Sequence, residues 1–151
     1  MALFLVQHGL SLPKDQDPEK GLSKKGFEDT QRIAKVAKSY GIPVSKIVQS
    51  GKKRARETAL IFSETLGIKE LSEQVDGINP LDDVKLFSDK IDPESGLMIV
   101  GHLPFLEKMV SYIITGNQDL KIYKFQNSGI VCLDQEENNW FIKWTLNPDI
   151  S

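Results

Sequence analysis

The sequence is poor in the residues that cross-link a chain or anchor it in a membrane. It has one cysteine, Cys132, among 151 residues, which excludes an internal disulfide and a zinc site built from several cysteines. Its longest apolar runs have the length of strands, so no transmembrane helix is expected. The net charge of −2 argues against a general nucleic-acid binder, because such proteins present a strongly basic face.

What remains is the composition of an ordinary globular protein. Hydrophobic side chains make up 40% of the chain, enough for a substantial core at this length, and we expect one domain over residues 1–151. The first residues carry no basic leader and no small-residue cleavage pattern, which favours a cytoplasmic location. Cys132 lies in an apolar run, so we interpret it as a small buried hydrophobe and not as a reactive thiol.

The chain begins with an apolar run that ends in a histidine. Residues 2–6 carry no charge and no breaker, a pattern typical of a central strand in a parallel sheet, and Gln7, His8 and Gly9 follow directly. Ligands of open α/β sheets bind beyond the carboxyl ends of the strands, which is where His8 would lie. Taken alone, a histidine in a turn more often ends a strand than serves a site.

A second unit repeats this pattern. Leu97–Val100 is again an uncharged strand, and Gly101 and His102 follow it. The chain has only two histidines, and both come directly after such strands. Imidazole titrates close to neutral pH and suits nucleophilic or proton-transfer chemistry, so we interpret His8 and His102 as parts of one site.

A third strand, residues 46–49, leads into a basic turn. Residues 50–58 carry several cations, with Arg54 in the middle, and open a helix that continues through Leu66. Cations are normally disfavoured at a helix N-terminus, whereas anions are attracted there and arginine matches phosphate geometry. The turn therefore indicates an anion site, with a solvated basic helix start as the alternative.

Strands and helices alternate along the chain, which indicates a layered α/β sheet. Ser23 is a predicted N-cap for a helix that ends near Tyr40. Residues 68–95 are the least regular, with a short helix expected over 81–90 and Val84, Leu86 and Phe87 facing inward. A helix is expected after His102, and three closing strands are expected at residues 121–125, 129–133 and 140–146.

Several segments together resemble the histidine phosphatase superfamily, which has the phosphoglycerate mutase-like fold, and within it the small SixA-type phosphohistidine phosphatases. The segments are Gln7–Gly9, Leu22–Gly26, Ser50–Thr58, Gly101–Pro104 and the stretch from Asn127 through Trp144. The resemblance implies a three-layer sandwich, with helices on both faces of a mostly parallel central sheet. It also implies that His8 accepts the phosphoryl group, while Arg54 and His102 complete the catalytic pocket and bind phosphate with Gln7 and His8.

The sequence departs from the family pattern at two positions. The first motif of the family is Arg-His-Gly, and Gln7 stands in place of its arginine; Gly51 replaces the usual proline after Ser50. We expect the change at Gly51 to be minor. Loss of the arginine weighs more, because removing one donor to the transferring group lowers the rate on the order of 10²–10³-fold. Lys52, Lys53 or Arg56 is a candidate to compensate.

The resemblance implies a phosphatase that needs no cofactor and acts on a phosphorylated protein carrying phosphohistidine, or on another reactive small phosphate. No metal site is expected, because the two histidines lack metal-ligand spacing. Related enzymes place an acidic proton donor in the irregular region, where Asp76, Asp82 and Asp83 are candidates, and none is assigned as catalytic. The alternative is an impaired module that binds phosphate or phosphohistidine, since Gln7 supplies no charge. The oligomeric state is left open.

Overall fold

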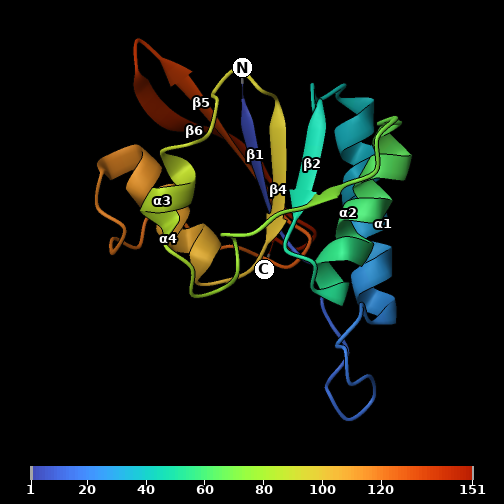
Figure 1. The fold of residues 1–151 in the computed structure, drawn as a ribbon. Helices are drawn as coiled ribbons and strands as arrows, with labels where there is room; N and C mark the ends of the chain where they lie inside the picture. Colours follow the sequence, from blue (N-terminus) through green and yellow to red (C-terminus); the bar gives the residue numbers. More distant parts are fainter. Residues whose placement is uncertain (1, 151) are drawn as a thin grey trace.

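The structure, a computed structural model, describes residues 2–150. Its helices and strands alternate through most of the chain (Figure 1). The elements are β1 Leu3–Gln7, α1 Lys24–Ser39, β2 Lys46–Gln49, α2 Lys53–Leu66, β3 Glu73–Gln74, α3 Val84–Ser88, β4 Leu97–Gly101, α4 Phe105–Thr115, β5 Ile130–Glu136 and β6 Asn139–Leu146. No helix in this range is long and apolar enough to cross a bilayer.

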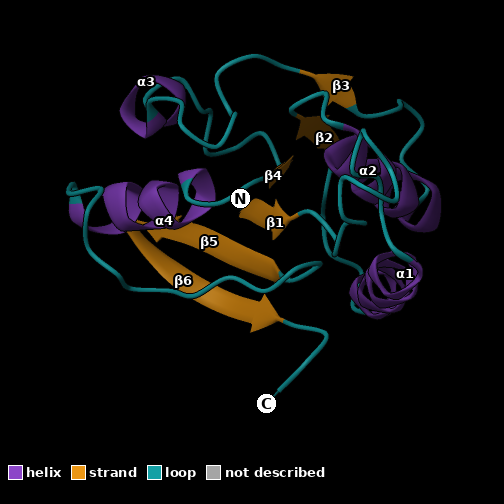
Figure 2. Ribbon diagram, turned by 90° about the horizontal axis from the view of Figure 1, so that it is seen from below, coloured by secondary structure: helices purple, strands orange, loops and turns teal. Residues whose placement is uncertain are grey.

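The strands form one six-stranded sheet in the order β3-β2-β4-β1-β5-β6. The first four are parallel to one another, β5 runs antiparallel to β1, and β6 runs antiparallel to β5. Seen along the sheet, α1 and α2 cover one face and α3 and α4 cover the other (Figure 2). The predicted three-layer sandwich with a mostly parallel sheet is therefore confirmed.

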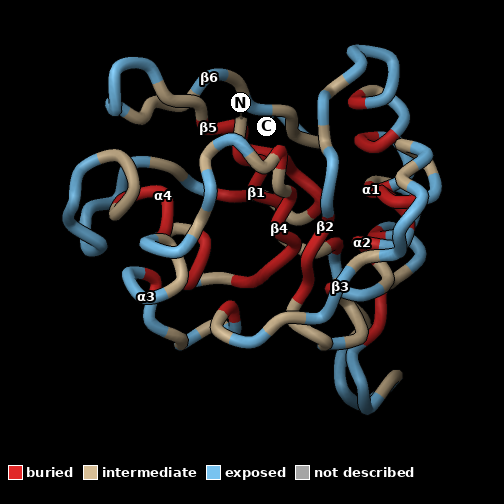
Figure 3. Tube along the Cα trace, turned by 45° about the horizontal axis from the view of Figure 1, so that its top comes forward, coloured by how far each residue is buried: buried red, intermediate tan, exposed pale blue. Residues whose placement is uncertain are grey.

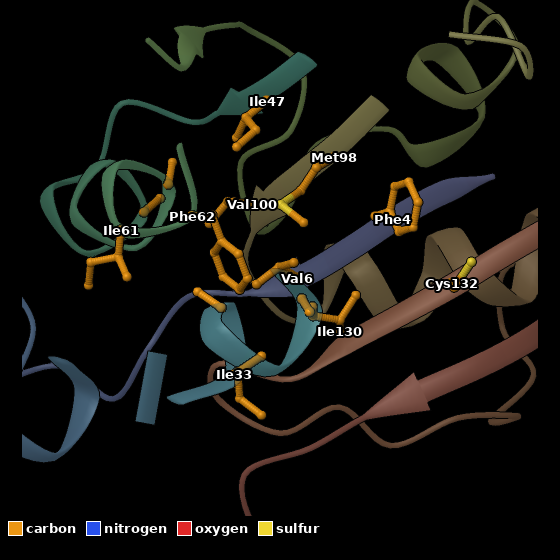
Figure 4. Close-up of a cluster of buried hydrophobic side chains, with 14 of the residues drawn as sticks. Phe4, Val6, Ile33, Ile47, Ile61, Phe62, Met98, Val100, Ile130 and Cys132 are labelled. Carbon is orange, nitrogen blue, oxygen red and sulfur yellow. The ribbon is translucent and has the colours of Figure 1, made fainter. Parts of the chain in front are cut away.

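The strand at the centre is buried on both faces because its side chains alternate between two cores. Phe4 and Val6 pack against α1 and α2 in one hydrophobic cluster (Figure 4). Leu3 and Leu5 pack in a second cluster against α3 and α4. This double burial explains the uninterrupted apolar run at the start of the sequence, and β1 and β4 lie among the most deeply buried segments in Figure 3.

Two predictions for the irregular parts of the chain are wrong. Residues 121–125 form no strand, and the sheet closes with β5 and β6 alone. The helix expected over 81–90 covers only Val84–Ser88, since the Asp83 side chain caps its N-terminus by accepting from Lys85 and Leu86 N–H. Within it, Leu86 is 60% exposed and does not face inward. The short strand β3 was not predicted.

The segment between β1 and α1 forms an extended loop that projects beyond α1 and α2 (Figure 1). Its two arms pair with each other, with an isolated antiparallel bridge between Ser11 and Leu22. The base of the loop packs directly on the first turn of α1 at Gly26. A Cβ atom there would lie well inside van der Waals distance of the Leu10 carbonyl oxygen. Gly26 is therefore required by the close approach of two backbones.

We predict that Gly26→Ala destabilises the protein although alanine is the better helix former. The added methyl group must displace the Leu10 backbone, and overpacking of this kind lowers the free energy of unfolding by about 1–3 kcal/mol. Urea denaturation measures the change. Gln31→Ala, at an exposed position of the same helix, is the control and should have little effect. Equal stability of Gly26→Ala and the wild type would contradict this account of the loop.

Candidate active site

The parallel register of the sheet brings the two histidines together. Gln7 is paired with Gly101 at the ends of β1 and β4, so the residues that follow them, His8 and His102, leave the sheet side by side. The His8 N–H still donates to the Gly101 carbonyl oxygen at 3.0 Å. The two imidazole rings lie with their centroids 5.1 Å apart.

The turn that carries His8 is held by hydrogen bonds on every side. The Gly9 N–H donates to Thr58 Oγ1 at 2.9 Å, and the Asn127 side-chain amide donates to the His8 carbonyl oxygen at 2.9 Å. The Ser128 N–H donates to the Gln7 carbonyl oxygen, also at 2.9 Å. Elements from both halves of the chain therefore fix the backbone of His8, and its side chain is aimed by a rigid frame.

The His8 ring is presented in the form that a nucleophile needs. Nδ1 lies 2.7 Å from the Gly9 carbonyl oxygen, and because a carbonyl only accepts, Nδ1 carries the proton. Nε2 is then unprotonated, and its lone pair accepts a hydrogen bond from the Arg54 Nε–H at 3.3 Å. Burial, together with the positive charges of Arg54 and Lys20, lowers the pKa of His8 to about 4 against the hydrogen bond to Gly9. The ring is thus neutral at pH 7.

Arg54 supplies an uncompensated positive charge beside that lone pair. It is the second residue of α2, and its side chain is partly buried; burial lowers its pKa, although a guanidinium remains charged at any ordinary pH. No ion pair joins it to a carboxylate among residues 2–150. A guanidinium without a protein counter-ion at a helix N-terminus favours a bound anion with several oxygens.

The third member of the group is His102, whose ring neighbours that of His8. The residue is 1% exposed, and burial, assisted by His8, Arg54 and Lys52, lowers its pKa to about 3. Its Nε2 lies 2.5 Å from Ser50 Oγ. Its Nδ1 is buried and has no hydrogen-bond partner in the described part of the chain.

The remaining predicted residues differ in where they point. Gln7 is partly buried, and its side-chain oxygen has no partner among residues 2–150. Lys53 is occupied elsewhere, because its Nζ pairs with Asp17 at 2.8 Å and holds the loop before α1. Arg56 is exposed, and so is Lys52, although the charge of Lys52 acts on His102. Of the three candidates to supply the charge of the missing arginine, only Lys52 remains, because its charge acts on His102.

Gly51 turns out to be more than a minor departure. Its φ is +93°, a left-handed conformation, and its N–H donates to the Gln49 side-chain oxygen at 2.5 Å. A proline has φ near −65° and no N–H, so it fits neither requirement. The turn after β2 therefore has a conformation that the family's usual proline would forbid.

The acidic candidates do not join the histidines. Asp83 caps α3, and the Asp82 carboxylate accepts the Asn79 N–H at 2.8 Å. Both line, with Asp76, a separate cavity of about 730 Å³ beside α3. Sequence reasoning gave no role to Thr58, Asn127 or Ser128, which support the His8 turn through contacts remote in sequence. Their only signal in the sequence is their place in the segments that carry the family resemblance.

Two imidazoles and a guanidinium make a donor set that suits an anion. No group of three or more His, Cys, Asp and Glu side chains is placed to hold a metal ion within residues 2–150. Neutral imidazoles accept or donate single hydrogen bonds, while the arginine supplies charge. The chemistry available is attack by His8 Nε2 on an electrophilic centre whose negative oxygens lie against Arg54.

Comparison with known proteins gave matches in structure only. No family model matches the sequence, and no curated protein matches it. The protein histidine phosphatase SixA in its tungstate complex superposes with a TM-score of 0.85 and 22% identity, over 98% of this chain and 97% of that one. The chain has the histidine phosphatase fold. The resemblance found in the sequence is confirmed at that level.

Two further structures show how widely this fold is shared. A protein from Agrobacterium tumefaciens assigned as phosphohistidine phosphatase SixA gives a TM-score of 0.78 and 22% identity, over 97% of each chain. The α-ribazole phosphatase from Shigella flexneri gives 0.74 and 12% identity, over 100% of this chain and 98% of that one. At such identities the histidine phosphatase fold is shared, and function must be argued from the site.

We predict that neither histidine titrates near the ordinary pKa of 6.5. Desolvation holds His8 and His102 neutral, so their imidazole proton NMR signals should not move between about pH 8 and pH 5.5. The two signals are assigned with His8→Ala and His102→Ala. A midpoint near 6.5 for either ring would contradict the burial described above.

The same shifts fix the sign of the stability change with pH. Below pH 6.5 the histidines bind protons in the unfolded chain but stay neutral in the folded protein. Acid therefore favours unfolding. The free energy of unfolding should fall by up to about 1.4 kcal/mol per pH unit for each ring as pH drops from 6.5 toward the folded pKa values. In His102→Ala this pH dependence should be weaker, which denaturation at pH 7 and pH 5 measures.

Proposed function

We propose that the protein is a histidine phosphatase with His8 as nucleophile. The observation that carries the proposal is the His8 ring itself: its Nδ1–H donates to the Gly9 carbonyl oxygen, and its Nε2 lone pair accepts from Arg54, a guanidinium with no carboxylate partner among residues 2–150. Nε2 forms a bond to phosphorus as the bond to the leaving group breaks. Water then attacks the phosphohistidine, releases inorganic phosphate and regenerates neutral His8.

The favoured substrate is a phosphohistidine on a protein, or another reactive small phosphate. Imidazole has a pKa near ~6.5 and leaves phosphorus with little help, whereas an alkyl alkoxide needs a strong acid beside it. The carboxylates proposed as acids from the sequence, Asp76, Asp82 and Asp83, line a different cavity. The fold shared with a protein histidine phosphatase supports the same substrate class.

A second candidate function is a module that binds phosphate or phosphohistidine without turnover. Gln7 favours it, because an amide offers hydrogen bonds and no charge at the position of the motif arginine. Lys53 is held by Asp17 and does not replace that charge. In this case the pocket of His8, Arg54 and His102 would retain an anion without transferring a phosphoryl group.

The first test is transfer to His8. The purified protein should hydrolyse an aryl phosphate or a phosphohistidine peptide without added metal, and His8→Ala should lower turnover on the order of 10⁶-fold, as loss of a nucleophile does. Brief incubation with labelled acetyl phosphate should leave an acid-labile phosphoryl group on the protein.

The second histidine provides the matched control. His102→Ala keeps the nucleophile and should still become labelled, whereas His8→Ala should not. Label that persists in His8→Ala, or turnover that a chelator alone abolishes, would remove His8 as the phosphoryl acceptor.

The residue that separates the two candidate functions is Gln7. Gln7→Arg places a guanidinium where charge develops on the phosphoryl oxygens, and turnover should rise by up to about 10²-fold. Steady-state kinetics together with phosphate affinity measure the effect, with Lys53→Ala as a control for charge outside the pocket.

The outcome of this substitution shows whether the native protein is an enzyme or a binding module. Activity that appears only in Gln7→Arg identifies the native chain as a binding module. An active native enzyme that is slowed by the change shows that Gln7 is adapted to its substrate. If neither rate nor phosphate affinity changes, Gln7 does not face the phosphoryl group.

A further inference from the structure

Ser50 is the first residue after β2, and it contacts the ring of His102. Its Oγ lies 2.5 Å from His102 Nε2. The same oxygen accepts a long hydrogen bond from the Lys52 N–H at 3.4 Å. A hydroxyl group has one proton to donate and two lone pairs, so an oxygen that accepts from Lys52 still has its proton for His102.

The other nitrogen of His102 faces the opposite way. The two nitrogens of an imidazole point to nearly opposite sides of the ring, so Nδ1 is turned away from Ser50. Because β4 lies between β2 and β1, the side opposite Ser50 is the side of His8. Nδ1 is buried without a partner within residues 2–150, and the centroid of the His102 ring lies 5.1 Å from that of the His8 ring.

These contacts decide which tautomer suits a phosphate site. A neutral imidazole carries one N–H, and the partner of one nitrogen sets the state of the other. If Nε2 donated to Ser50, the Nδ1 lone pair would face the phosphoryl oxygens and repel them. If Ser50 donates to Nε2, Nδ1 carries the proton and becomes a donor at the site.

We propose that Ser50 is a positioning residue that holds His102 in its Nδ1-protonated tautomer, so that an N–H donor faces the phosphoryl group at His8. The inference deepens the proposed function and rests on it for the identity of the bound group. It also gives the unpaired Nδ1 a partner, because a phosphoryl oxygen would satisfy a buried donor that the protein leaves unmatched.

The unusual turn after β2 supports this role. Gly51 adopts φ +93° and its N–H is fixed by the buried amide of Gln49, which is 4% exposed. A Cβ atom at Gly51 would collide with the Gln74 side chain at 2.5 Å. The hydrogen bond to Gln49 and the left-handed φ of Gly51 thus define the turn from which the Ser50 hydroxyl reaches His102.

The test reads the tautomer directly by imidazole nitrogen NMR at about pH 7.5, where both rings are neutral. In the wild-type protein, free and with tungstate, His102 should show Nδ1–H. In Ser50→Ala the proton should shift to Nε2 or divide between the nitrogens, and tungstate affinity should fall about tenfold, as for one lost hydrogen bond. Ser50→Thr retains a hydroxyl and should restore both. Ser39→Ala, at the far end of α1, should change neither.

Three results would overturn the inference: Nε2–H in the wild type, an imidazolium in the tungstate complex, or an unchanged tautomer in Ser50→Ala. The wild-type spectrum shows which nitrogen of His102 carries the proton, so it tests the inference even if Ser50→Ala fails to fold. The measurement needs no turnover, so it is separable from the proposed function. An inactive protein with Nδ1–H at His102 would keep this inference and lose the phosphatase, and an active protein with Nε2–H would do the reverse.

Discussion

Parallel pairing of β1 with β4 is the constraint on which the site depends. It places the residues after Gln7 and Gly101 next to each other, and it is itself fixed by burial, because both strands are covered on both faces. A shift of the register by one residue would turn every core side chain of β1 to the wrong layer. The energy that holds the two histidines together is therefore the packing of the whole sandwich, and the local hydrogen bonds only aim the rings.

Burial that holds the sheet together also sets the chemistry. Removing the rings from water keeps His8 and His102 neutral, and the same low dielectric strengthens the field of Arg54 at His8 Nε2. The neutral His8 ring thus lies beside the charged Arg54 guanidinium, and no carboxylate in the described structure pairs with that guanidinium. Nδ1 of His102 has no hydrogen-bond partner and the Arg54 guanidinium has no carboxylate partner within residues 2–150, so an oxyanion would complement both groups.

The sequence predicted the parts of this site that depend on strand ends. Apolar runs before His8 and His102, and cations after β2, were enough to place three turns at one edge, because the carboxyl ends of parallel strands must meet there. The sequence-based prediction failed where contacts between residues remote in sequence determine the structure. The segment 121–125 has strand-like residues but pairs with no strand of the sheet, although β3 and β6 are edge strands. Nothing local shows that Lys53 is held by Asp17, or that Asn127 reaches the His8 carbonyl from the other half of the chain.

The presence of Gln7 in place of the motif arginine affects two properties in opposite directions: the stabilisation of charge on the phosphoryl oxygens and the basicity of His8. A second guanidinium would stabilise charge on the phosphoryl oxygens, but it would also lower the pKa of His8 further than Arg54 and Lys20 already do. A less basic imidazole is a weaker nucleophile. Since His8 with a pKa of about 4 is already neutral at pH 7, further lowering gains no nucleophilic form and reduces only basicity. Rates respond to the basicity of a proton-accepting or nucleophilic group less than proportionally, whereas a well-placed donor is worth on the order of 10²-fold. Under the proposed phosphoryl transfer, the stabilisation of charge on the phosphoryl oxygens is therefore the larger effect. A glutamine at this position would then favour substrates whose leaving group departs without a second guanidinium.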